Sequence, residues 1–177
     1  MLLTTSRRPC HLARILGREL ARLLPDSEYV PRGVKTIEKV AALARQRGHH
    51  RVIIINSSSD RPSEMRFLEV GGTWQWLNAS MKLAGVAVNR VKIKGKNFGG
   101  LKIYAGDPGS FNFSRWLSRV LSIECTDRLP ESGPVVLLTS DGGLKIRFRI
   151  MPCAEEVGPV LSVASFGPLF RGANLEV

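Results

Sequence analysis

The sequence has few acidic residues and no concentrated block of basic ones. It holds 15 Asp and Glu against 26 Lys and Arg in 177 residues, which gives a formal net charge of +11. Such a balance favours a polyanionic partner, and nucleic acid is the usual one. Because the basic residues are spread along the chain, we expect a folded basic surface and not a basic arm. An apolar content of 44% fits a globular protein and excludes a disordered tail.

The chain also has little cysteine and no long apolar run. Cys10, Cys125 and Cys153 are odd in number and widely spaced, so they form neither a CxxC pair nor a disulfide framework. The three histidines do not join them at metal-ligand spacing. No stretch reaches the roughly 18 apolar residues that cross a bilayer, and Met1–Leu3 is too short for a signal peptide. We therefore expect a cytoplasmic protein with reduced thiols, no membrane partner, no metal and no cofactor.

Catalytic motifs are missing as well. There is no G-x-S-x-G elbow, no dinucleotide fingerprint and no supported Ser–His–Asp set. The basic, glycine-rich stretch Lys92–Gly100 lacks the GKS or GKT ending of a P-loop, which argues against a cradle for ATP phosphates. Turn chemistry explains Asp107-Pro108-Gly109 and Asp141-Gly142-Gly143. We expect that the protein is not an enzyme.

A basic amphipathic helix is predicted between Thr4 and Pro25. Thr5 or Ser6 can cap it, and Pro9 is tolerated only in a first turn. Apolar residues recur at helical spacing on one face: Leu12, Ile15, Leu16, Leu20 and Leu23.

Arginines recur on the nearly opposite face of this helix, at Arg14, Arg18 and Arg22. Arg7 and Arg8 stand just before it, where unpaired backbone N–H groups already favour an anion. The stripe can bind phosphates or can be an ordinary solvated face, and the helix alone leaves both readings open.

Further elements follow along the chain. A second helix is expected over Val34–Arg47, ended by Gly48. Alternating or apolar runs predict strands at Arg51–Asn56, Ser63–Val70, Thr73–Leu77 and Val86–Ile93. Trp74 and Trp76 share one strand face, where they can be core residues or a platform for stacking bases.

The second part of the chain resembles the first. A strand at Leu101–Ala105 precedes a helix at Phe111–Ile123, whose Arg115 and Arg119 match Arg14 and Arg18 at an offset of 101 residues. Later strands match at smaller offsets: Val52 with Val135 at 83, and Arg66 with Arg147 at 81. The drop of 18 residues is close to the length of the second helix.

This pattern predicts a duplicated unit in which the later copy lacks the second helix, with chance similarity of short strands as the alternative. Strands alternating with helices imply an α/β fold with a mixed sheet in each half, over residues 1–97 and 98–177. We expect a cleft where the halves meet, lined by the starts of both arginine-striped helices.

Four motifs resemble the Brix domain family of ribosome biogenesis proteins. Thr4–Pro9 is similar to the TTSRxPS opening of the family's pre-rRNA processing branch, with Cys10 where serine is usual. Arg32-Gly33 leads into the second helix. Arg61-Pro62, followed by Met65 and Phe67, resembles an R-x-P-x-x-M strand with closer Arg-Pro spacing. Glu156–Pro159 is similar to an E-x-G-P strand entry.

The resemblance implies one Brix-like domain over residues 1–177, of a minimal archaeal type. Its two halves would each resemble the anticodon-binding domain of class IIa aminoacyl-tRNA synthetases. It also implies RNA binding during ribosomal subunit assembly, without catalysis, and an RNA-contact role for Arg7, Arg8, Arg32 and Arg61. The full set of expected RNA-binding residues is Arg7, Arg8, Arg14, Arg18, Arg32, Lys35, Arg61, Lys94, Lys96, Arg115 and Arg119.

The expected partners are pre-rRNA or rRNA and other ribosome assembly proteins. A protein-binding scaffold or a tRNA-binding module are the alternatives. Binding through phosphates would weaken steeply with salt, whereas scaffold contacts would survive it.

Overall fold

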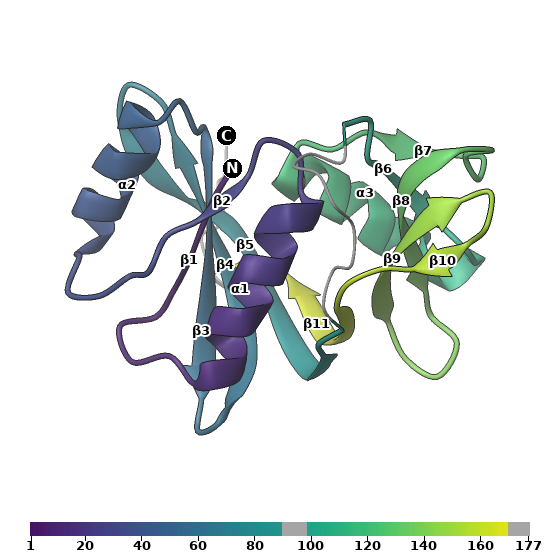
Figure 1. The fold of residues 1–177 in the computed structure, drawn as a ribbon, viewed down its shortest axis with the longest axis horizontal. Coiled ribbons are helices and arrows are strands. Elements are labelled where there is room, and N and C mark those ends of the chain that lie inside the picture. The colour runs from purple at the N-terminus through teal and green to yellow at the C-terminus, as the bar shows by residue number, and fades with distance from the viewer. Residues whose placement is uncertain (90–98, 170–177) are drawn as a thin grey trace, which may run out of the picture.

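The computed structural model describes residues 1–89 and 99–169, which form a mixed α/β fold around one large sheet (Figure 1). The helices are α1 (His11–Leu23), α2 (Ile37–Gln46) and α3 (Phe111–Leu121), with a 3₁₀ turn at Pro108–Ser110. The strands are β1 (Leu2–Thr5), β2 (Glu28–Tyr29), β3 (Arg51–Ser58), β4 (Arg61–Val70), β5 (Trp74–Ala87), β6 (Lys102–Ala105), β7 (Cys125–Thr126), β8 (Gly133–Thr139), β9 (Lys145–Met151), β10 (Glu155–Glu156) and β11 (Val160–Gly167).

The ends of the two N-terminal helices follow from local capping. The Sγ of Cys10 accepts a hydrogen bond from the Ala13 N–H at 3.4 Å, so α1 begins after Cys10 and not at Thr5 or Ser6. The Oγ1 of Thr36 accepts one from the Lys39 N–H at 3.4 Å and starts α2. The predicted start of the second helix at Val34 is therefore wrong, and Val34 is 94% exposed outside it.

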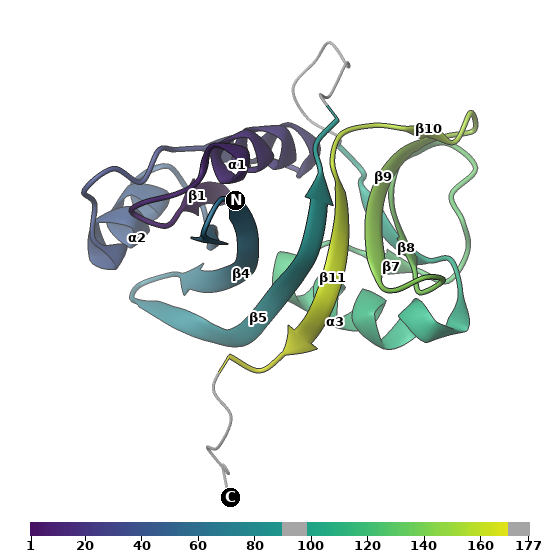
Figure 2. The ribbon, with the colours of Figure 1, turned by 90° about the horizontal axis from the view of Figure 1, so that it is seen from below.

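The sheet has the strand order β2-β1-β3-β4-β5-β11-β9-β8-β6-β7, with β10 paired to β9. We call β1 to β5 the N-terminal half and β6 to β11 the C-terminal half, and the antiparallel pair β5–β11 joins them (Figure 2). The predicted break between Thr73–Leu77 and Val86–Ile93 is wrong over the described residues, because β5 runs continuously from Trp74 to Ala87. The expected boundary between residues 97 and 98 lies at the edge of the stretch that the structure leaves undescribed.

The two halves have matching strand pairings. In each, the first strand runs parallel to two neighbours, and two antiparallel strands continue towards the centre. Leu2 pairs with Val52 as Lys102 pairs with Val135, and Ile54 pairs with Arg66 as Leu137 pairs with Arg147. These registers agree with the offsets of 83 and 81 read from the sequence. No helix stands between β7 and β8, a stretch in which every residue is described.

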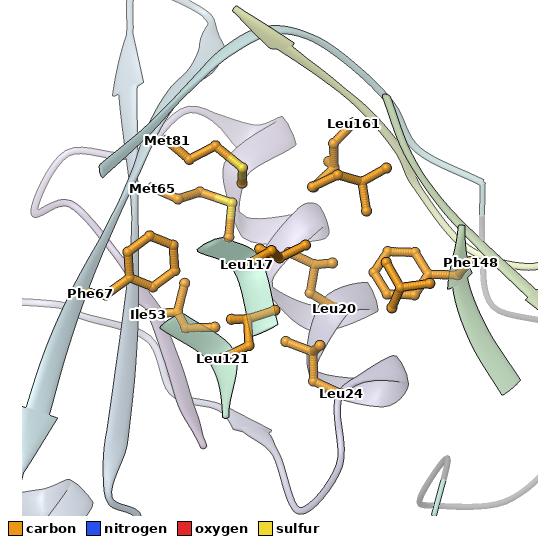
Figure 3. A pocket seen from close by; sticks show the side chains of 12 residues that line it. Leu20, Leu24, Ile53, Met65, Phe67, Met81, Leu117, Leu121, Phe148 and Leu161 are labelled. Carbon is orange, nitrogen blue, oxygen red and sulfur yellow. The ribbon is translucent and has the colours of Figure 1, made fainter. Parts of the chain in front are cut away.

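The main core lies where α1 and α3 pack against the inner face of the sheet. Residues of both halves share it, and the rings of Phe67, Phe113, Trp116 and Phe166 contact one another within it. It encloses a space of about 20 Å³ lined only by apolar side chains, among them Leu20, Met65 and Leu117 (Figure 3). With no polar group to hold a ligand, this space is a packing gap and not a binding site.

A second, smaller core lies on the outer face of the N-terminal half. There α2 places Val40, Ala41 and Ala44 against β1, β3 and β4. Across the described part of the chain, no helix is long and apolar enough to span a membrane.

Candidate nucleic-acid interface

A polar hollow of about 450 Å³ opens beside the start of α2, on the outer face of the N-terminal half. It lies beside Ser6 and Arg7, which follow β1, and beside Asn56, near the end of β3. We call it the arginine hollow, because Arg7, Arg32 and Arg66 line it. The other lining residues are Ser6, Thr36, Ile37, Glu38, Ile54, Asn56 and Trp76.

Arg32 is the most buried cation of the arginine hollow, with only 6% of its surface exposed. Its Nε donates a hydrogen bond to the Lys35 carbonyl at 2.7 Å, in a turn where Gly33 takes a positive φ of 52°. Burial, and then the positive charge of Arg7, lower the pKa of Arg32, and Glu38 partly offsets them. A buried guanidinium beside a like charge is stabilised by any anion that enters.

The start of α2 contributes a second attraction for anions. Ile37 and Glu38, at the start of the helix, line the arginine hollow, and the unpaired N–H groups of a helix start carry a partial positive charge. A hydrogen bond with the Thr36 side chain lowers the pKa of Glu38, which keeps its carboxylate charged. That carboxylate is the one acidic side chain among the residues that line the hollow.

The far wall of the hollow comes from the sheet. Arg66 Nε donates to Glu64 Oε2 at 2.7 Å, and Asn56 Nδ2 donates to the same oxygen at 3.1 Å. Trp74 and Trp76 both pack against the smaller core, as the core reading predicted. Trp76 also lines the arginine hollow, together with Arg7, Arg32 and Arg66. The hollow thus combines basic side chains with an aromatic one.

The structure brings only part of the expected RNA-binding set to this hollow. Arg7 and Arg32 line it, and Arg8 is exposed next to Arg7. Lys35 lies in the turn before α2, where its Nζ donates to the Pro31 carbonyl at 3.3 Å. Arg61 is exposed at the start of β4.

The helix arginines lie elsewhere on the surface. Arg14 and Arg18 are exposed on α1, and the Arg18 guanidinium stands 5.8 Å from the centre of the Tyr29 ring. Arg115 and Arg119 are exposed on α3, with Arg119 Nε donating to the Arg115 carbonyl. Lys94 and Lys96 lie outside the described residues.

The hollow between the halves differs from the expected cleft. It measures about 480 Å³ and is lined by residues at the ends of the two striped helices, such as Pro25 and Ser122, and not by their starts. None of the expected arginines lines it. Arg51 Nη2 donates to Ser122 Oγ at 3.2 Å there and ties the halves together. Inner-face packing of α1 and α3 explains the difference, because it fills the space between the halves with apolar side chains.

The 3₁₀ turn Pro108–Ser110, which leads into α3, is capped by a carboxylate of the chain itself. Asp107 accepts hydrogen bonds from the N–H of Ser110 at 3.1 Å, from the N–H of Ser140 at 2.7 Å and from Ser140 Oγ. The Ser140 side chain, followed by the backbone N–H groups, lowers the pKa of Asp107. By contrast, the first turn of α1 has no acidic residue and follows Arg7 and Arg8.

Sequence reasoning missed Arg66 and Asn56 as members of the site. The sequence pattern matches Arg66 only with Arg147, and Asn56 only ends a predicted strand. Asn56 comes near Arg7 because β1 and β3 are parallel neighbours with Thr5 opposite Ile55, and Arg66 comes near through the pairing of β4 with β3. No sequence pattern pointed to either residue. Within the described residues, no group of three or more His, Cys, Asp or Glu side chains could hold a metal ion.

Curated relatives of this chain carry the name of one family, although no family model matches it. A probable Brix domain-containing ribosomal biogenesis protein of Pyrococcus horikoshii is 39% identical over 99 residues, which are 55% of this chain and 44% of that protein. The alignment thus spans less than half of the relative's length. The protein of the same name from Methanopyrus kandleri is 28% identical over 186 aligned residues, with 93% of each chain covered.

Solved structures share the fold. A probable ribosomal biogenesis protein from Aeropyrum pernix has a TM-score of 0.76 at 23% identity, covering 94% of this chain and 97% of that one. The archaeal Imp4-like protein Mil has a TM-score of 0.65 at 20% identity, covering 95% and 99%. The resemblance to the Brix domain family, predicted from the motifs, is confirmed.

Proposed function

We propose, from the premise that this chain resembles the Brix domain proteins of ribosome biogenesis, that it binds rRNA during subunit assembly. It would assist pre-rRNA folding or processing in the cytoplasm, without catalysis and together with other assembly proteins. The observation that carries the proposal is the buried guanidinium of Arg32 facing Arg7 at the start of α2.

The arginine hollow suits an RNA phosphate. A guanidinium presents several N–H donors in a fixed fork that matches phosphate oxygens, and Arg32 is already held in place by the Lys35 carbonyl. A bound phosphate would offset the repulsion between Arg7 and Arg32 and accept from the start of α2. Trp76 would lie beside the neighbouring nucleotide, within reach of a base.

Exposed arginines before and along α1 add to this proposed site. Arg8, Arg14 and Arg18 would neutralise further phosphates along an RNA strand or hairpin. Affinity would then come from backbone charge and shape, and it would fall as salt rises. This surface replaces the cleft between the halves as the proposed binding route.

We further propose that the halves arose by duplication and that each is like an anticodon-binding domain, within a single domain over residues 1–177. The matching registers of Leu2–Val52 with Lys102–Val135 support the duplication. The absence of a second helix between β7 and β8 also supports the duplication, because the offset between matching residues of the two halves drops there by 18.

The test is binding of a pre-rRNA fragment and of tRNA across a salt series. Wild type is compared with Arg7→Glu, Arg8→Glu, whose side chains are both exposed, with folding checked by circular dichroism. The matched control is Arg45→Glu, Arg128→Glu, which changes the net charge equally at two other exposed positions. We expect the first variant to bind at least about tenfold more weakly and to lower the salt slope by about 2, and the control to do much less.

Other results would favour other functions. Equal affinity for both RNAs in all variants would remove the arginine hollow as a specific site. Tighter binding of tRNA would favour a tRNA-binding module. Absence of RNA binding, with capture of assembly proteins that survives high salt, would favour the scaffold.

A further inference from the structure

The outer face of the C-terminal half is the counterpart of the face that α2 covers in the N-terminal half. Side chains alternate along a strand, and Ile103 points into the main core, so Lys102 and Tyr104 point to the outer face of β6. On β8 and β9, Val136 and Phe148 point inwards in the same way. The outer residues of these strands are Val135, Leu137, Thr139, Lys145, Arg147 and Arg149.

Strand pairing arranges these side chains in rows across the sheet. Tyr104 stands opposite Leu137, which stands opposite Arg147. In the next row, Lys102 and Arg149 flank Val135. The rows place one half-buried aromatic ring and one leucine among basic side chains on the outer face of the sheet.

Val135 is fully buried, although the described residues provide no helix on this face. Its direct neighbours are Lys102 and Arg149, whose long apolar stems can cover it. The segment 127–132 also crosses β6 on this face, because it joins the parallel strands β7 and β8 on either side of β6 while α3 fills the inner face. The centre of the face is therefore closed to water, and the basic side chains around it are half-buried. This face offers a partner basic side chains and the Tyr104 ring, but no apolar groove.

The positive charges are only partly paired. Lys102 Nζ lies 3.2 Å from Glu124 Oε1, and Arg147 Nη1 lies 3.0 Å from Glu156 Oε2. Lys145 and Arg149 have no ion-pair partner within residues 1–89 and 99–169. The Nε of Arg149 is also buried without a hydrogen bond. Two cations thus remain without an ion pair, with Glu156 standing opposite Arg149 across the β9–β10 pair.

We propose that this face, which we call the open sheet face, binds single-stranded RNA. One base stacks on Tyr104 beside Leu137, and Lys145 and Arg149 contact the phosphates on either side. The proposal rests on the proposed function in one respect, because both take RNA as the ligand. The site itself is separate from the arginine hollow and lies on the other half of the sheet.

The residue changes between the halves favour RNA over a protein helix as the occupant. At the equivalent positions of the N-terminal half, Leu2 and Leu68 pack under α2, whereas the open sheet face has Lys102 and Arg149. A docking helix would need the apolar residues that are missing. An unpaired strand can present a base to a ring on a flat sheet, while a duplex keeps its bases stacked inside.

The experiment measures binding of a ten-nucleotide oligouridine and of a ten-base-pair RNA duplex by fluorescence anisotropy. We expect Tyr104→Leu to weaken oligouridine binding about tenfold while leaving duplex binding nearly unchanged. Lys145→Glu, Arg149→Gln, which leaves the ring in place, should also weaken it. Folding of each variant is checked by circular dichroism.

Photocross-linking keeps the test independent of how the variants fold. An oligouridine carrying 4-thiouridine should cross-link to the wild-type peptide that contains Tyr104, and also to that peptide in Arg7→Glu, Arg8→Glu. If the cross-link persists and Arg7→Glu, Arg8→Glu does not weaken binding of the pre-rRNA fragment, the open sheet face is supported and the arginine hollow is rejected.

Two results would overturn the proposal. One is oligouridine binding that is unchanged in both variants, with no cross-link at Tyr104. The other is binding of an acidic amphipathic helical peptide, weakened by Lys145→Glu, Arg149→Gln, in a protein that does not bind the oligonucleotide. That result would make the face a docking site for a protein.

Discussion

The N-terminal half of the sheet carries a helix on its outer face, whereas the C-terminal half leaves the equivalent face uncovered by any helix in the described chain (Figures 1 and 2). Under α2 the strands present Leu2, Val52 and Leu68 to a packed core. At the matching positions the other half has Lys102, Val135 and Arg149. Where no helix covers the sheet, basic residues stand at the positions that leucines hold in the other half.

The two helix starts differ in a related way. Arg7 and Arg8 precede α1, whose first turn has no acidic residue, while Asp107 caps the 3₁₀ turn before α3 with its own carboxylate. The start of one striped helix thus has two arginines beside it, and the approach to the other has a carboxylate. The comparison teaches that similar strand frameworks can carry surfaces of different charge, set by one helix and a few side chains.

Exchanging one residue between the halves should have the largest effect on stability. Leu68→Arg copies Arg149 into a fully buried position under α2. We expect the free energy of unfolding to fall by about 4 kcal/mol, because a buried charge is left without a partner. Urea unfolding followed by circular dichroism measures it. A loss below about 1 kcal/mol would mean that α2 moves aside easily.

Removing the ring that joins the halves should come next. Trp116 on α3 meets Phe67 of β4 edge to face at 6.0 Å between centroids, across the boundary between the halves. Trp116→Ala should lower the free energy of unfolding by about 3 kcal/mol. Both halves share the main core, so we expect one urea transition by fluorescence and circular dichroism alike. Two separate transitions would show that the halves fold independently.

The carboxylate that caps the 3₁₀ turn before α3 should make stability depend on pH. Hydrogen bonds lower the pKa of Asp107 in the folded state, so its stabilisation is complete above the ordinary aspartate pKa of about 4 and is lost as the pH falls through the lower folded value. Asp107→Asn should flatten that part of the curve of melting temperature against pH.

The control for this measurement is Asp141→Asn, at an exposed carboxyl in the turn after β8. This variant should keep the wild-type shape of the curve below pH 4. If both variants behave alike, Asp107 is not the group whose protonation weakens the fold.

The reverse exchange should have the smallest effect. Arg149→Leu removes a guanidinium whose Nε is buried without a partner, so we expect the free energy of unfolding to stay within about 1 kcal/mol of wild type, or to rise. Urea titration checks this against Leu68→Arg. A large loss would show that Arg149 supports the sheet, contrary to its place on the open sheet face.

The sequence was sufficient for the parts of the fold that depend on local pattern. The spacing of the leucines in α1 and the matched arginines of α3 predicted both helices, and the strand offsets agree with the pairings of Ile54 and Leu137. Features set by distant contacts were missed. The close approach at Gly17 is an example. A Cβ there would stand 2.7 Å from the Tyr29 ring, and no local sequence pattern predicts that contact.

The candidate site was predictable in part for the same reason. Arg7 and Arg32 were found through motifs, but Arg66 and Asn56 join them only because β4 and β3 pass beneath the start of α2. The sequence predicts a cleft lined by the starts of both striped helices, but the hollow between the halves is lined by their ends. Helix periodicity predicts which face of a helix is apolar, and not the direction in which its start points. Both striped helices bury their apolar faces between the halves, and their C-terminal ends flank the hollow there.

The central claim is that the halves differ in RNA binding, with the arginine hollow and the start of α1 as the stronger site. The most direct measurement compares the salt dependence of pre-rRNA fragment binding for Arg7→Glu, Arg8→Glu and for Arg115→Glu, Arg119→Glu, two pairs of exposed arginines with the same change in charge. We predict that the first pair lowers the salt slope by about 2 and the second by clearly less. Equal losses for both pairs, or a larger loss for the α3 pair, would contradict the account.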